Sequence, residues 1–269
     1  MEQFPGPQPR SIERRHFDLL RSQPYVVCEK TDGVRYILKR DETCVLVNRA
    51  LEVTQVALNL PRGTILDGEL VTYRSGRKMF VIHDAMFIRG EDVTQLPLTE
   101  RLDRARQVVR GVITTPKSPF GLTVKNMVPL EDFDTLPTEF PYETDGLVFT
   151  PVNEPIRSGT HETMFKWKPR ERITIDFLVK GRDLYIQEYG RLLKETELHC
   201  AHDYPDGTII ECGYGELGWT PVKVRTDKTH PNNRRTYLRT LVNLRESIGY
   251  NEFKDVLRPI TNGNRKEGD

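Results

Sequence analysis

The sequence predicts an α+β protein in two parts: a body of mixed strands and helices, then a smaller all-β module after about residue 173. Short apolar runs of strand character recur along most of the chain, whereas three segments repeat their apolar residues with helical spacing. Beyond residue 173, strand patterns follow one another and end in one helical segment. The length of 269 residues, of which 37% are hydrophobic, suits two modest domains.

Composition and charge exclude several protein classes. No apolar run approaches the roughly 18–20 residues of a membrane span, so we expect no integral membrane protein. Residues 1–15 lack the apolar stretch of a secretory signal. The net charge of +1 excludes a polycation, so any contact with nucleic acid must come from local clusters. The cysteines form no CxxC pair and are expected to be reduced thiols of an intracellular protein: Cys28, Cys44, Cys200 and Cys212.

The N-terminal half predicts two helices among strands. Three prolines and a glycine make residues 1–10 a loose lead-in, after which Ser11 can cap a helix to about Gln23. Thr99 can cap a second helix through about Arg110, because its apolar residues share one face. Strands are expected over 25–29, 35–39, 44–47, 64–73, 79–87, 123–128 and 146–151.

The C-terminal module begins with a half-buried strand over 173–179, in which apolar residues alternate with others. Further strands are expected over 184–187, 208–214 and 219–225, and a last helix over about 235–248 with Gly249 as its stop. Residues 221–240 carry six Lys or Arg and one acid, whereas residues 129–145 hold six acids and no Lys or Arg. The basic stretch can face phosphate groups or form a solvated surface, and charge alone leaves both interpretations open.

Lys30 is the first candidate for chemistry, at the end of an apolar strand and before an Asp32-Gly33 turn. A lysine held there beside other cations and partly desolvated becomes nucleophilic. Arg35 opens the next strand and can hold a phosphate or ribose group nearby. Taken alone, the motif is better explained as an ordinary hairpin with an exposed lysine, because so short a pattern occurs by chance.

Four more motifs follow the first. Asp67-Gly68 predicts a tight turn before Glu69, and Asp145 precedes a glycine that enters an apolar strand. Lys166 and Lys168 share one face of a strand, where two ammonium groups repel unless an anion lies between them. Residues 222–232 are dense in phosphate-binding side chains. Hairpins and exposed sheet edges explain each motif separately.

Together and in this order, the five motifs resemble those of the covalent nucleotidyltransferase superfamily of mRNA capping guanylyltransferases and polynucleotide ligases. The resemblance covers about residues 25–250 and is to the capping branch. The strand Lys166-Trp167-Lys168-Pro169 and the run Arg225-Thr226-Asp227-Lys228, followed by Pro231-Asn232, decide this. The resemblance implies a nucleotidyltransferase domain of antiparallel sheets with flanking helices over 1–173. An OB-fold domain with a C-terminal helix would follow over 174–269.

The resemblance also implies the reaction of an mRNA guanylyltransferase. Lys30 would attack the α-phosphate of GTP, form a lysyl-N–GMP phosphoramidate and release pyrophosphate. GMP would then pass to the 5′-diphosphate end of RNA and form the GpppN cap. Arg35 and Glu69 would hold the ribose, and Asp145 would bind Mg²⁺ or Mn²⁺. The expected phosphate contacts are Lys166 and Lys168 to the α-phosphate, and Arg225 and Lys228, oriented by Asp227, to the β- and γ-phosphates.

One departure concerns the base. The family usually places an aromatic residue before an aspartate, and here His83 precedes Asp84. Either His83 or Phe87 would stack on the guanine, and the alternative is that Phe87 belongs to the core.

Two other functions stay open. An ATP-dependent RNA or DNA ligase would use the same lysine through a lysyl-AMP intermediate, and a catalytically silent nucleotide- or RNA-end-binding module would form no adduct. RNA triphosphatase and cap methyltransferase activities are expected on other chains or regions. The expected location is the nucleus for a cellular protein, or the cytoplasm for a viral one.

Overall fold

The computed structural model describes residues 3–257, which form two compact units. The first unit contains residues 3–10, 15–165 and 249–257, and the second contains residues 11–14 and 166–248. The boundary between units lies at residue 165, whereas the domain division expected at residue 173 stays a prediction.

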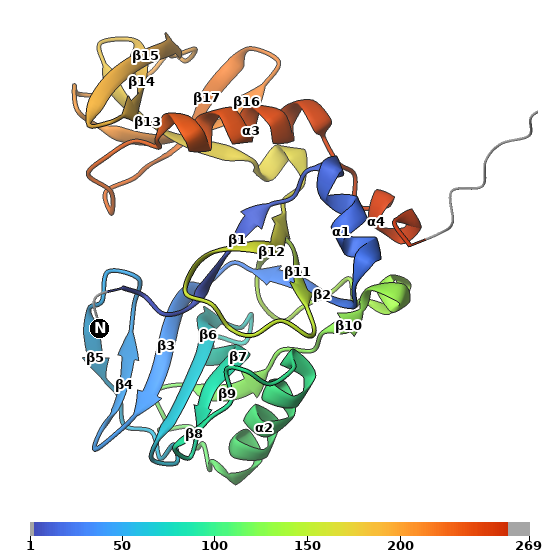
Figure 1. Ribbon diagram of the computed structural model, residues 1–269. Helices are drawn as coiled ribbons and strands as arrows, with labels where there is room; N and C mark the ends of the chain where they lie inside the picture. Colours follow the sequence, from blue (N-terminus) through green and yellow to red (C-terminus); the bar gives the residue numbers. More distant parts are fainter. Residues whose placement is uncertain (1–2, 258–269) are drawn as a thin grey trace, which may run out of the picture. The chain divides into compact units, whose positions relative to one another are not determined.

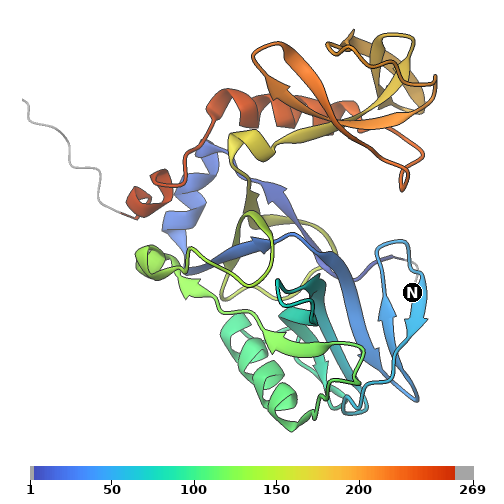
Figure 2. The ribbon, with the colours of Figure 1, turned by 180° about the vertical axis from the view of Figure 1, so that it is seen from behind.

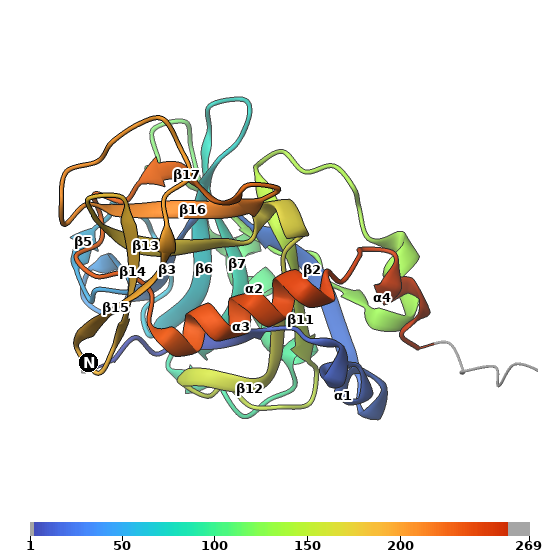
Figure 3. The same cartoon turned by 90° about the horizontal axis from the view of Figure 1, so that it is seen from above.

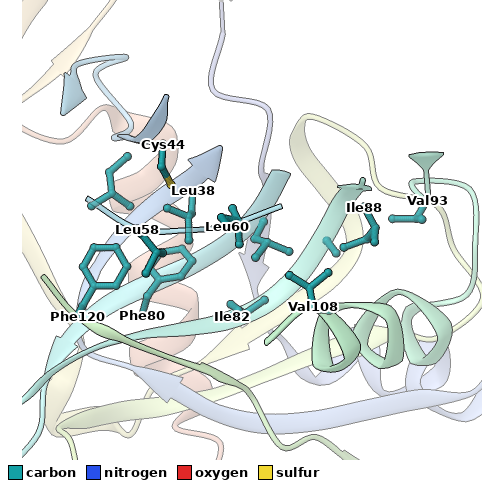
Figure 4. Close-up of a cluster of buried hydrophobic side chains, with 14 residues drawn as sticks. Leu38, Cys44, Leu58, Leu60, Phe80, Ile82, Ile88, Val93, Val108 and Phe120 are labelled. Carbon is teal, nitrogen blue, oxygen red and sulfur yellow. The ribbon is translucent and has the colours of Figure 1, made fainter. Parts of the chain in front are cut away.

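The larger sheet of the first unit has the order β5-β4-β3-β6-β7-β8, and β9 pairs with β7 in parallel (Figure 1). Its strands are β3 (Val34–Arg40), β4 (Cys44–Val47), β5 (Val53–Gln55), β6 (Thr64–Thr72), β7 (Lys78–Ile88), β8 (Glu91–Asp92) and β9 (Gly121–Val124). Helix α2 (Leu98–Gly111) lies against β7 and β9 (Figure 2). Ala105 and Val108 of α2 join a buried apolar cluster with residues such as Leu38 and Phe80 (Figure 4). The side chains of each strand alternate between the two faces of the sheet, so the clustered residues lie on one face. Helix α2 covers that face.

The second sheet of this unit has the order β1-β12-β11-β2-β10. Its strands are β1 (Pro7–Ser11), β2 (Tyr25–Thr31), β10 (Val128–Pro129), β11 (Thr144–Pro151) and β12 (Gly159–Trp167). Strand β2 lies between β11 and β10 and is buried along most of its length, which explains its continuous apolar start. The short helices are η1 (Arg14–His16), α1 (Phe17–Ser22), η2 (Leu130–Thr135) and α4 (Glu252–Asp255).

The second unit contains a five-stranded antiparallel sheet in the order β15-β14-β13-β16-β17, which is the strand order of an OB-fold. Its elements are η3 (Arg170–Arg172), β13 (Thr174–Lys180), β14 (Asp183–Glu188), β15 (Arg191–Glu197), β16 (Ile209–Gly215), β17 (Gly218–Val224) and α3 (Arg234–Glu246). Figure 3 shows α3 running beside this sheet, into whose core it inserts Tyr237 and Leu244. No helix within residues 3–257 has the length and apolar character to span a membrane.

Three predicted helix ends are wrong. Ser11 caps nothing, because β1 pairs with β12 and keeps Ser11 in an extended strand. Thr99 lies inside α2, whose N-cap is Pro97. Helix α3 stops before Gly249, because Ser247 adopts the left-handed conformation with φ of 44° and closes the helix there.

The predicted turn at Asp67-Gly68 is also wrong, because β6 continues through both residues. A Cβ atom on Gly68 would lie 2.5 Å from the Val81 carbonyl oxygen and 2.8 Å from the Phe80 ring. The register between β6 and β7 shifts at this point, so the two strands approach more closely than a side chain permits. Gly68 is thus required by strand packing.

We expect Gly68→Ala to lower the free energy of unfolding by about 1–3 kcal/mol, because the added methyl group overpacks the contact between β6 and β7. Urea denaturation measures the change. Gly111→Ala is the matched control, since nothing lies within 4 Å of a Cβ atom at that helix end. Equal stability of the two variants would contradict the prediction.

Candidate active site

Lys30 is held at the end of β2 by a carboxylate from the neighbouring strand. Its Nζ donates a hydrogen bond of 2.8 Å to Asp145 Oδ1, and the two side chains are 22% and 11% exposed. The pairing of β2 with β11 shifts between Thr144 and Leu147, and Asp145 lies in this irregular stretch. A bulge re-aims a side chain in this way, so the backbone directs Asp145 toward Lys30.

Arg35 and Glu69 are cross-strand partners, and Asp67 lies two residues before Glu69 on the same face of β6. Asp67 accepts two hydrogen bonds from Arg35, from Nε at 3.0 Å and from Nη2 at 2.6 Å. The Asp67 carboxylate is fully buried, and His83 Nε2 lies 3.3 Å from its Oδ1. The sequence motif therefore places Arg35, Glu69 and His83 around a buried aspartate that had been interpreted as a turn residue.

The charges on this face depend on one another. Burial opposes ionisation of Asp67, yet the Arg35 guanidinium holds the pKa of Asp67 below its ordinary value. Burial raises the pKa of Glu69, although Lys125, Lys30 and Arg35 act in the opposite direction. Burial lowers the pKa of His83 to about 4, so its imidazole is neutral at pH 7.

A second buried network locks the residues on either side of Lys30, and the sequence did not indicate it. Lys125 Nζ donates to the Glu29 carbonyl oxygen at 2.8 Å and to the Thr31 hydroxyl. The Tyr142 hydroxyl donates to the Glu29 carboxylate, which also lies 3.4 Å from Lys125 Nζ. Lys125 comes from a separate part of the chain with no motif around it, so only the fold reveals its role.

Two more residues lie near this face. Phe87 is partly buried and packs against the cluster of Phe4, Ile37 and Met86, so its stacking on a base stays a prediction. Desolvation and the charge of Arg35 lower the pKa of Arg49, whereas the charges of Glu69 and Asp67 act in the opposite direction. Arg49 follows β4 and carried no signal in the sequence.

The basic motif of the second unit is organised by a buried carboxylate, Asp176 of β13. Arg225 Nη1 donates to Asp176 Oδ1 at 3.0 Å, and Lys228 Nζ donates to Oδ2 at 2.6 Å. Asp227 accepts two further bonds from Arg225, at 2.9 and 2.8 Å, and this lowers the pKa of Asp227 to about 2. The alternation over 173–179 places Asp176 on the face opposite the core, which is a signal that sequence analysis missed.

Lys166 and Lys168 line a cavity of about 160 Å³ in the second unit, together with Trp167 and Arg170. Trp167 Nε1 donates to the Ile248 carbonyl oxygen at 2.8 Å, and Arg170 donates to the Leu244 carbonyl oxygen. Strand β12 ends at Trp167, so Lys168 lies just after the strand rather than on the same strand face as Lys166. This strand end is tied to the C-terminal end of α3, whose last carbonyl groups lack partners within the helix.

A strand-end lysine beside a carboxylate, followed by an OB-fold, defines the class of covalent nucleotidyltransferases. The solved structure titled mycobacterial DNA ligase D complexed with ATP and MES shares this fold, with a TM-score of 0.51 and 12% identity. The match covers 83% of this chain and 94% of the ligase chain. At this identity the likeness shows the fold alone.

The particular family follows from the sequence comparisons. Residues 1–170 match the family model described as mRNA capping enzyme, catalytic domain, and residues 157–253 match mRNA capping enzyme, C-terminal domain. The chain therefore belongs to the mRNA capping enzyme family.

Relatives from several organisms agree with this assignment. The mRNA-capping enzyme of Danio rerio is 27% identical over 85% of this chain and 45% of its own length. The mRNA-capping enzyme subunit alpha of Neurospora crassa is 25% identical over 96% of this chain and 85% of its own length. The Schizosaccharomyces pombe alpha subunit is 30% identical over 66% of this chain and 53% of its own length. The chain thus spans about half the length of two of these relatives.

On acidification the free energy of unfolding should fall less in His83→Phe than in the unaltered protein. The folded pKa of about 4 lies below the ordinary 6.5, so the unfolded chain takes up the proton first and stability falls between pH 6.5 and 4. The difference in unfolding free energy between pH 7 and pH 5 should shrink by on the order of 1–2 kcal/mol, as measured by urea denaturation. His199→Phe, at an exposed position, should leave this difference between pH 7 and pH 5 unaltered. An unchanged difference in His83→Phe would refute the prediction.

We expect Asp176→Asn to lower the free energy of unfolding by about 1–3 kcal/mol, because it leaves Arg225 and Lys228 without their buried carboxylate. Thermal or urea unfolding measures the loss. Asp203→Asn is the control, since Asp203 pairs with Arg182 on the exposed surface, where an ion pair contributes about 0–1 kcal/mol. A loss no larger than that of the control would show that Asp176 does not anchor the motif.

Proposed function

We propose that the chain is an mRNA guanylyltransferase that acts through a covalent lysyl-GMP intermediate. The observation that carries this proposal is the position of Lys30: its amine lies at the end of β2, fixed by Asp145, within a chain that belongs to the capping enzyme family. Arg35, Glu69 and His83 lie on a neighbouring sheet face of the same unit. The nucleotide would bind over this face.

In the first half-reaction the Lys30 amine, after losing a proton, attacks the α-phosphorus of GTP. An N–P bond forms, the bond from the α-phosphorus to the bridging oxygen breaks, and pyrophosphate leaves. In the second half-reaction a terminal oxygen of the 5′-diphosphate RNA attacks the same phosphorus. The N–P bond breaks, GMP is transferred to form GpppN, and the lysine amine is regenerated.

Asp145 fits a divalent cation that is shared with the substrate. Magnesium is usually held by one or two carboxylates together with substrate phosphates. Within residues 3–257 no group of three or more His, Cys, Asp or Glu side chains could hold a metal ion. Mg²⁺ or Mn²⁺ bound at Asp145 would neutralise charge on the triphosphate.

The phosphate contacts complete the proposal. Lys166 and Lys168 would contact the α-phosphate, and Arg225 and Lys228 would contact the β- and γ-phosphates, with Asp227 orienting Arg225. Arg225 and Lys228 share Asp176, so they would act as one unit of positive charge. We propose a catalytic domain over 1–173 and an OB-fold domain over 174–269 that moves to deliver the motif to the phosphates.

The proposal extends to partners. Relatives from Neurospora crassa and Schizosaccharomyces pombe are named as alpha subunits, which supports an RNA triphosphatase or a cap methyltransferase on other chains or regions. An mRNA substrate places the reaction in the nucleus of a cell, or in the cytoplasm for a viral enzyme.

We expect the chain to become labelled by α-³²P-GTP with Mg²⁺ or Mn²⁺, and Lys30→Arg to abolish the label, because a guanidinium is never deprotonated in proteins. Denaturing gels and acid lability of the N–P bond measure the adduct. Lys78→Arg is the control, because Lys78 is exposed at the start of β7.

Two other labelling results would each point to a different function. Label from α-³²P-ATP alone would identify a ligase-type adenylyltransferase and overturn the capping proposal. The absence of label from every nucleotide, with retained nucleotide binding, would identify a silent binding module.

A further inference from the structure

The N-terminal segment of residues 4–7 closes over the guanidinium of Arg35. Phe4 is buried in a cluster with Ile37 and Met86, and Arg35 Cζ lies 5.2 Å from the centre of its ring. Arg35 Nη1 donates a hydrogen bond of 2.8 Å to the Pro7 carbonyl oxygen. The segment therefore holds the guanidinium on one face and one edge, while Asp67 holds it from another edge.

Gly6 lies between these groups with no space for a side chain. A Cβ atom there would be 2.5 Å from Arg35 Nη2, 2.6 Å from the Phe4 ring and 2.7 Å from Asp67 Oδ2. Gly6 does not have a left-handed φ, so the backbone conformation does not require a glycine. The contact with the ion pair does require a glycine. The guanidinium and the carboxylate are fixed by two mutual hydrogen bonds and cannot move aside separately without breaking them.

We infer that residues 4–7 are a positioning segment of the nucleotide site, acting through Arg35. An arginine in a salt bridge with a single aspartate can still rotate and slide, whereas Arg35 has its Nε, Nη1 and Nη2 atoms each assigned to a partner and one face covered by an aromatic ring. The N–H groups left over, at Nη1 and Nη2, then point in a fixed direction. A hydroxyl or phosphate oxygen of the nucleotide would find them preorganised.

The ligand in this role, a nucleotide, rests on the proposed function. The contacts between residues 4–7 and Arg35 do not depend on that function. The alternative is that the segment only covers the apolar cluster around Phe4. The two interpretations differ in one respect. A positioning segment affects the nucleotide site through Arg35, whereas a segment that only covers the apolar cluster has effects that do not depend on Arg35.

Gly6→Ala tests the inference through the kinetics of adduct formation. We expect the KM for GTP to rise about tenfold, which is about 1.4 kcal/mol, with a smaller change in kcat. In an Arg35→Lys background the guanidinium that Gly6 contacts is absent, so Gly6→Ala can no longer act on the nucleotide through it and should change the KM less than about twofold there. Gly111→Ala is the control. Equal effects of Gly6→Ala in both backgrounds would overturn the inference.

A readout without GTP separates this inference from the proposed function. The side-chain Nε–H resonance of Arg35 reports its bond to Asp67, and Gly6→Ala should shift or broaden it while Gly111→Ala leaves it unchanged. Phe4→Leu, which keeps an apolar side chain but removes the ring, should also shift it if Gly6→Ala fails to fold. An unmoved resonance in the folded variant would refute the positioning role. A moved resonance in a protein that no nucleotide labels would support it while the proposed function fails.

Discussion

The buried ion pair of Arg35 and Asp67 is the interaction on which the first unit's candidate site depends. A carboxylate at 0% exposure is tolerated only when its charge is compensated by close, well-aligned donors. Two parallel hydrogen bonds from Arg35 provide this, and His83 Nε2 lies 3.3 Å from one of the carboxylate oxygens. Once the pair is fixed, Glu69 and the segment that contains Gly6 have defined positions beside it. The site is thus built around a structural charge pair rather than around a flexible cation.

The position of Lys30 follows a related logic. For the proposed role as a nucleophile, an amine must be positioned precisely and yet be able to exchange its hydrogen-bond partner. Backbone irregularity in β11 presents a single carboxylate, Asp145, to its Nζ. The network of Lys125 with Glu29 and Thr31 fixes the neighbouring residues instead of the amine itself. The backbone is therefore fixed on both sides of Lys30, while the Lys30 amine itself donates a hydrogen bond to Asp145.

Sequence patterns predicted most strands of both units, because period-two alternation and continuous apolar runs directly reflect burial. They failed where the outcome depends on a distant segment. Residues 7–11 form a strand only because β12 lies beside them, and Gly68 is compatible with a turn until the approach of β7 is known. The motif residues were found by their order along the chain, whereas Lys125 and Asp176 were not, since isolated charged residues acquire meaning only through partners far away in sequence. The contacts between motif and ligand, and the domain division at residue 173, stay predictions.

The charges of the second unit indicate how a cluster of basic side chains is held in a stable arrangement. Arg225 forms ion pairs with two carboxylates that differ in burial: Asp176 is buried, and Asp227 is exposed. An exposed ion pair contributes little net free energy and is readily exchanged, whereas breaking a buried pair leaves an uncompensated charge. The bonds to Asp176 therefore hold Arg225 and Lys228 to the sheet, whereas the exposed pair with Asp227 orients Arg225 at little cost. Asp176 thus keeps the two cations together, and Asp227 sets the direction of the Arg225 guanidinium.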